Sequence, residues 1–117
     1  MRDNMRNLLR ITVIVAIALA ASLVAAAEAK TLLGKWMKPN MGAALAGQDF
    51  DALQKSLQLV ADKPPPGSDF PKWSAMSQGG ADAAKAKDLK GVKKSCKDCH
   101  DAYKESYIKA FPTRAFP

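Results

Sequence analysis

The chain has 117 residues, of which 48% are hydrophobic and 25% are charged, with 18 lysines and arginines against 11 acidic residues. This length suits one globular domain and excludes two. Two cysteines are too few for a disulfide-rich scaffold, and an aromatic content of 7% argues against a sheet that stacks nucleic-acid bases on aromatic side chains.

The hydrophobic residues are concentrated near the N-terminus, in a run of 17 residues over 11–27 that follows a leader with three arginines. A positive leader, an apolar run and small residues are typical of a secretory signal peptide. Cleavage fits after Ala27 or after Ala29, and we favour Ala29, which gives a signal peptide over residues 1–29 and a domain over residues 30–117. An uncleaved membrane anchor is the competing interpretation, because the run reaches the short end of a spanning helix. Both interpretations predict export, and we expect a periplasmic protein.

Cleavage after Ala29 leaves 88 residues with 15 basic and 9 acidic side chains, a net charge of +6. A core of this size stabilises a fold only modestly, and a metal or cofactor often supplements it. The positive charge favours steering toward an acidic partner protein or an anionic surface, and nucleic acid is not an expected partner of an exported chain.

Beyond residue 30 the sequence predicts four helices and no strand, because alanine, lysine, leucine and glutamine dominate. The first helix is expected over residues 31–46, and Pro39 either kinks it or begins it. Its predicted buried stripe consists of Leu33, Trp36, Met37, Asn40, Met41 and Ala44.

The second helix is expected to begin after an Asp49 N-cap and to end near Ala61, before a proline-rich extended link over residues 63–68. Ser68 or Asp69 is the predicted cap of the third helix. Within that helix, Gly79 and Gly80 indicate either a break or the close approach of a neighbouring helix or a flat ligand.

The fourth helix is predicted over residues 89–110, capped by Asp88, and it contains a CxxCH motif at Cys96, Cys99 and His100. In such a motif two thiols attach covalently to a haem, and the adjacent imidazole binds the iron. Positions i, i+3 and i+4 share one helix face, so all three side chains can reach one porphyrin. A Cys96–Cys99 disulfide and a zinc site are the alternatives, but the zinc site would need a carboxylate because no second histidine exists.

A CxxCH near the C-terminus, followed by Tyr103 and Lys104 and preceded by a methionine-bearing first helix, resembles the class II c-type cytochromes, which comprise cytochrome c′ and its low-spin, methionine-ligated relatives. The resemblance implies an all-α fold, a compact antiparallel four-helix bundle with one covalently attached haem c. It also implies that Tyr103 and Lys104 lie at the haem. Lys104 stands where the family usually has arginine, so a contact to a haem propionate would be weaker.

The sixth iron position distinguishes the possible functions. Met37, between Trp36 and Lys38, resembles the segment that supplies the axial methionine in the low-spin relatives, whereas Met41 one turn later is the alternative, and no protein ligand is the third option. Methionine ligation predicts an electron carrier with acidic redox partners rather than an enzyme. An open position predicts a binder or sensor of NO or CO. A homodimer is left open, and membrane association is expected only if the N-terminal segment is retained.

Overall fold

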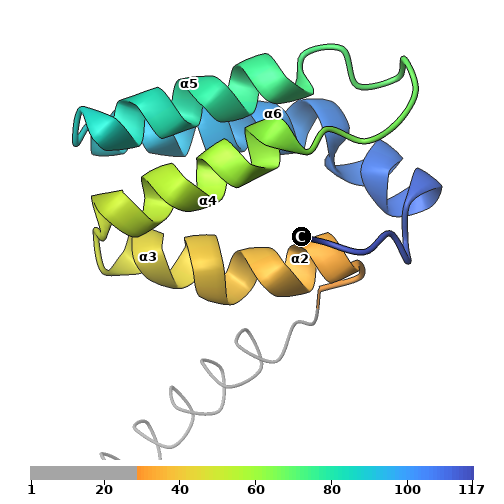
Figure 1. Ribbon diagram of the computed structural model, residues 1–117, viewed down its shortest axis with the longest axis horizontal. Coiled ribbons are helices and arrows are strands. Elements are labelled where there is room, and N and C mark those ends of the chain that lie inside the picture. The colour runs from red at the N-terminus through yellow and green to blue at the C-terminus, as the bar shows by residue number, and fades with distance from the viewer. Residues whose placement is uncertain (1–28) are drawn as a thin grey trace, which may run out of the picture.

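The computed structural model describes residues 29–117, so the predicted signal peptide lies outside the described residues except for its last position. The first helical segment, residues 32–46, consists of α2 (Leu32–Met37), the π-helical turn η1 (Lys38–Gly42) and α3 (Ala43–Ala46). Three further helices follow: α4 (Phe50–Asp62), α5 (Trp73–Lys85) and α6 (Leu89–Ala110). The chain reverses direction at each connection (Figure 1). The all-α prediction is confirmed for residues 29–117, which contain no strand and no helix long and apolar enough to cross a membrane.

The first helical segment passes Pro39 without a break, because a π turn accommodates the missing N–H group. The Ala43 amide donates to the Lys38 carbonyl, five residues back, and the Asn40 side chain donates to the Trp36 carbonyl at 2.8 Å. The prediction that Asn40 belongs to the buried stripe is wrong. Its side chain is exposed because it turns back along the helix to this carbonyl.

The predicted caps of the second and fourth helices are confirmed. The Asp49 carboxylate accepts from the Ala52 amide at 3.1 Å at the start of α4, and the Asp88 carboxylate accepts from the Gly91 amide at 3.0 Å at the start of α6. Both carboxylates satisfy amide groups that the first helical turn leaves without a partner. The bounds of α6 agree with the predicted range of residues 89–110.

The predicted start of the third helix is wrong. Neither Ser68 nor Asp69 caps α5, which begins at Trp73 with Lys72 at its N-cap position and no side-chain cap on its own segment. The Lys72 amide instead donates to the Tyr103 hydroxyl at 2.8 Å. A residue of α6, 31 positions along the chain, therefore satisfies the amide that a local cap was expected to take.

The glycine pair in α5 marks a close approach of neighbouring helices and not a break. A Cβ atom on Gly80 would lie 2.7 Å from the Ser95 hydroxyl oxygen of α6 and 3.2 Å from both methyl groups of Leu57 in α4. Nothing lies within 4 Å of the corresponding position on Gly79. A side chain at Gly80 would force Ser95 and Leu57 to shift, so glycine at this position allows both neighbouring helices to approach α5 closely.

The helices are packed in chain order, with the first helical segment against α4, α4 against α5 and α5 against α6. Among residues 29–117, no Cα atom of the first helical segment lies within 8 Å of a Cα atom of α6. Directly packed helices have axes 8–10 Å apart, which brings some of their backbone closer than this. The side of the bundle between the first helical segment and α6 is therefore not closed by backbone packing.

Two groups of buried side chains hold the helices together. An aliphatic cluster toward one end contains Leu53, Leu57, Ala81, Ala84 and Val92, and Cys96 packs against it. An aromatic cluster toward the other end is built on Leu33, Val60, Phe70, Trp73 and Tyr107. The Trp73 indole donates to the Val60 carbonyl at 3.0 Å, so this ring is a core anchor between α5 and α4.

Candidate functional site

The CxxCH motif lies in the middle of α6, where Cys96, Cys99 and His100 occupy one helix face as predicted. Cys96 and Cys99 are half-buried, and both thiols are free. His100 is exposed. A covalent ligand could thus reach both sulfur atoms from the same side as the imidazole.

The surroundings of these side chains favour their neutral forms. Burial raises the pKa of Cys96, against a backbone hydrogen bond that lowers it. Burial, together with repulsion from Cys96, raises the pKa of Cys99 to about 11. Desolvation by the surrounding protein lowers the pKa of His100, Lys104 lowers it further, and Asp101 acts in the opposite direction. The lowered pKa favours the neutral imidazole, which is the form that binds a metal.

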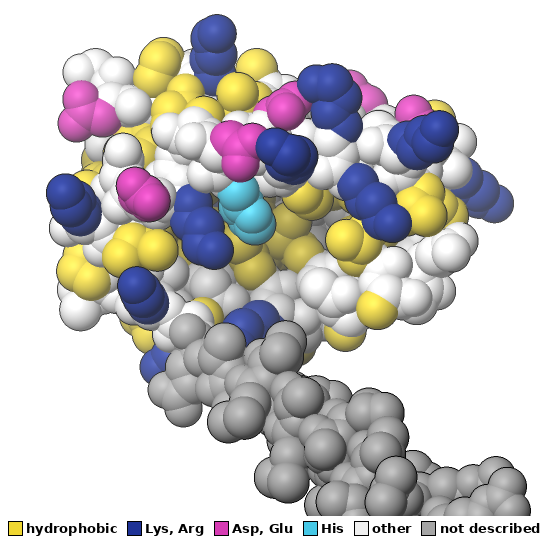
Figure 2. Space-filling model, turned by 180° about the vertical axis from the view of Figure 1, so that it is seen from behind, with side chains coloured by type: hydrophobic (Ala, Val, Ile, Leu, Met, Phe, Trp, Pro, Cys, Tyr) yellow, Lys and Arg dark blue, Asp and Glu magenta, His cyan; other side chains and the backbone are white. Residues whose placement is uncertain are grey.

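The motif borders the open side of the bundle. Figure 2 shows the single histidine at the edge of a hollow whose floor is formed by hydrophobic side chains, with lysine and arginine side chains around it. This hollow lies between α6 and the first helical segment, whose backbones do not meet. An apolar floor beside two thiols and an imidazole suits a flat, largely apolar cofactor.

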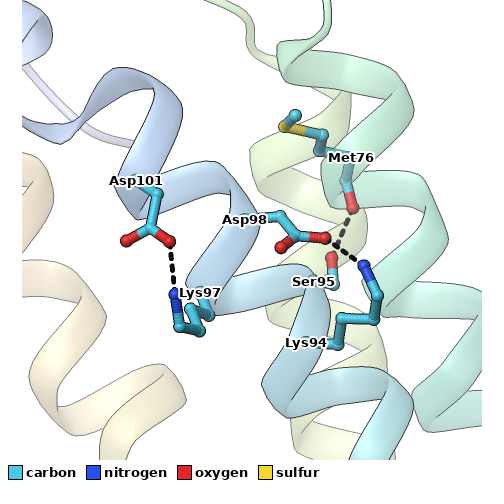
Figure 3. A network of polar contacts seen from close by, with 6 residues as sticks. All are labelled: Met76, Lys94, Ser95, Lys97, Asp98 and Asp101. Atoms are coloured by element: carbon cyan, nitrogen blue, oxygen red, sulfur yellow. Dashed lines mark hydrogen bonds and ion pairs between the residues drawn. The ribbon is translucent and has the colours of Figure 1, made fainter.

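The turn of α6 that carries the cysteines is tied to α5 from behind. The Ser95 hydroxyl donates to the Met76 carbonyl at 2.5 Å, next to Gly80 (Figure 3). This contact fixes the rotation of α6 about its own axis, because it uses the side chain immediately before Cys96. The next side chain, that of Cys96, packs against the aliphatic cluster.

The solvent side of α6 carries several exposed lysines. Lys94 pairs with Asp98 at 2.6 Å and Lys97 pairs with Asp101 at 2.5 Å, both at exposed i, i+4 positions (Figure 3). Exposed pairs of this kind add little stability, but they reduce the net positive charge of this face.

Tyr103 and Lys104, which the resemblance places at the haem, follow His100 on α6. Tyr103 is half-buried within the aromatic cluster, with its ring centroid 5.3 Å from that of Phe70. Its hydroxyl accepts from the Lys72 amide and still has a proton to donate. Lys104 is exposed and close enough to His100 to lower its pKa.

Both candidate methionine ligands lie in the first helical segment and are half-buried. Met37, the last residue of α2, packs against the aromatic cluster. Met41 lies within the π turn and packs against both clusters. The fold thus places both thioethers on the element that faces α6 across the open side of the bundle.

The residues at this site fit a c-type haem. The donor set consists of two free thiols and a neutral imidazole on one face, beside an apolar hollow that backbone packing leaves open. Within residues 29–117 no group of three or more His, Cys, Asp or Glu side chains is arranged to hold a metal ion, so the zinc interpretation has no ligand set. A surface cavity of about 650 Å³ lies elsewhere, between the first helical segment and α4, and includes none of the motif residues.

Several supporting residues were not predicted from the sequence. Ser95 gives no local signal of its contact with α5. Arg114 and Phe116, which lie in the C-terminal residues beyond α6, contact the link after α4 and the first helical segment. Two phenylalanines five positions apart, each followed by proline, were the available signal that this tail is packed.

No protein-family model matches the chain, and no curated protein or solved structure matches it significantly. The assignment of a function therefore depends on the motif and on the geometry around it.

Proposed function

We propose that this protein is an exported mono-haem cytochrome similar to the class II c-type cytochromes, which carries single electrons between partner proteins. The observation that carries the proposal is the CxxCH motif on one face of α6, beside an apolar hollow that the first helical segment does not close. In this proposal Cys96 and Cys99 hold one haem c through thioether bonds, and His100 binds its iron.

When bound, the haem supplies an iron that accepts and releases one electron. Cys96, Cys99 and His100 would hold this group, and the surrounding side chains would exclude water from it. Attachment to residues i and i+3 of a helix fixes the orientation of the group relative to α6, while the lowered pKa of His100 keeps its imidazole free of a competing proton. The apolar floor of the hollow excludes water from the same side.

The first helical segment supplies the sixth ligand in this proposal. Met37 is our first choice because its sequence context resembles that of the axial methionine in the low-spin relatives, and Met41 is the matched alternative on the same segment. A thioether ligand raises the reduction potential. An iron with two permanent protein ligands has no open site, which suits electron transfer better than gas binding.

The test compares the purified holoprotein with Met37→Ala and Met41→Ala. Wild type is expected to show low-spin ferric iron and to bind no CO when reduced. Met37→Ala is expected to become high-spin and to bind CO, whereas Met41→Ala keeps the low-spin signal. The reverse pattern would assign the ligand to Met41 within the same function. A wild-type protein that is high-spin and binds CO would overturn the carrier proposal in favour of gas binding.

The basic side of α6 is the surface that we propose for an acidic redox partner. Among the ion pairs of residues 29–117, Lys94 and Lys97 have partners, and none involves Lys90, Lys93 or Lys104, all of which are exposed. Long-range attraction by such charges is screened over about 8 Å at physiological salt. Electron transfer to an anionic oxidant such as ferricyanide should therefore slow as the salt concentration rises.

The location of this surface can be tested by charge reversal. Lys93→Glu is expected to reduce the rate with ferricyanide and to weaken its salt dependence. Lys85→Glu on α5 makes the same change of charge at another exposed position and should have a smaller effect. Equal effects of the two variants would show that the rate depends on the net charge of the protein and not on the surface of α6.

A further inference from the structure

We propose that the C-terminal residues 111–117, here called the strap, position the first helical segment opposite α6. This inference goes beyond the proposed function, because it concerns how two elements without backbone contact are held at a fixed separation. The strap begins where α6 ends and runs to α2 (Figure 1).

The strap is anchored at its start by Phe111. This residue is the C-cap of α6, where its amide donates to the Tyr107 carbonyl at 2.8 Å. Its ring centroid lies 5.5 Å from that of Tyr107 and 6.0 Å from that of Phe70. The tail therefore leaves α6 as part of the aromatic cluster.

The strap is anchored again in its middle by Arg114. One terminal nitrogen of its guanidinium donates to the Lys63 carbonyl at 3.1 Å and to the Pro64 carbonyl at 3.2 Å. The other nitrogen lies 3.5 Å from the Tyr107 hydroxyl oxygen. The planar guanidinium thus connects α6, the strap and the link after α4, a geometry that its fixed fork of donors suits.

The strap contacts the first helical segment through Phe116. Its ring meets that of Trp36 edge-on, with centroids 4.8 Å apart and an interplanar angle of 64°. Trp36 immediately precedes Met37, the candidate ligand. Because no backbone contact joins this segment to α6, the Phe116–Trp36 pair is a direct link between the end of one element and the other.

Backbone hydrogen exchange of the full-length chain tests the strap with a matched control. Phe116→Ala should speed exchange of the α2 amides about tenfold. This factor corresponds to the upper end of the stabilisation that one aromatic pair contributes. Phe116→Tyr keeps the ring and should restore the wild-type rate. Phe50→Ala removes another half-buried phenylalanine that packs on the aliphatic cluster, and should leave α2 unchanged. Unchanged α2 exchange in Phe116→Ala would overturn the proposal.

Arg114→Ala is an independent test, because it leaves the ring of Phe116 in place but removes the hydrogen bonds that anchor the middle of the strap. It should also speed exchange in α2. A wild-type rate there would contradict the proposal that the strap holds α2 through the hydrogen bonds of Arg114. In the holoprotein, the low-spin ferric signal should weaken in Phe116→Ala and persist in Phe116→Tyr and Phe50→Ala. A chain without haem would contradict the proposed function, while the exchange measurement would still decide the strap.

Discussion

The glycine pair of α5 offers a sharp test of how the motif is held in place, because one residue is packed and its neighbour is not. Alanine at Gly79 meets no atom within 4 Å. Alanine at Gly80 would place its Cβ 2.7 Å from the hydroxyl oxygen of Ser95 and 3.2 Å from two methyl groups of Leu57. The two substitutions change the same atoms in the same helix, so only the packing differs.

The expected magnitudes follow from this difference. Each substitution gains about 1 kcal/mol from the better helix propensity of alanine. Gly79→Ala should keep that gain. At Gly80 the extra methyl group must displace Ser95 and Leu57, and overpacking of this kind costs about 1–3 kcal/mol. Gly80→Ala should therefore be less stable than Gly79→Ala by about 1–3 kcal/mol.

Urea unfolding monitored by circular dichroism measures the difference, and thermal unfolding should show it as a lower Tm for Gly80→Ala by about 4–8 °C per kcal/mol. The sign is the decisive result. Equal stability of the two variants, or a more stable Gly80→Ala, would refute the reasoning that Gly80 is needed for α4 and α6 to approach α5 closely.

Two further predictions concern the thiols and the tyrosines of α6. In the haem-free chain, Cys99 should stabilise the fold below its unfolded pKa of 9.0, and this contribution should disappear as pH rises through its folded pKa of about 11. The urea midpoint of Cys99→Ala, measured over the same pH range, should lack this part of the fall, and an identical fall would contradict the assignment. Tyr103→Phe removes the acceptor of the Lys72 amide and should cost about 0.5–1.5 kcal/mol in free energy of unfolding. Tyr107→Phe removes only a 3.5 Å contact with Arg114 and should cost less; a larger loss there would reverse this ranking.

The sequence predicted most of the helices because their signals are local. Asp49 and Asp88 cap the amides three residues ahead of them, and the apolar stripes repeat at helical spacing. The start of α5 was not predictable in this way. The amide of its N-cap residue, Lys72, is satisfied by Tyr103, and the pairing of residues 31 apart leaves no trace in local patterns.

The candidate site was predictable to the same extent. The CxxCH spacing alone places Cys96, Cys99 and His100 on one face, and the structure has them there. Whether Met37 or Met41 would face the iron of the proposed haem depends on the π turn between them and on how the first helical segment lies across from α6. The strap that we propose to hold this segment has no periodic pattern, so its role could emerge only from the contacts of Arg114 and Phe116.

Covalent haem attachment is the central claim, and acid extraction of the natively exported protein into organic solvent tests it most directly. Wild type should keep its haem on the polypeptide through this treatment, since thioether bonds withstand it. A Cys96→Ala, Cys99→Ala double variant should release any haem that it binds. A wild-type chain that loses its haem to the solvent, or that is recovered with two free thiols and no haem, would contradict the account.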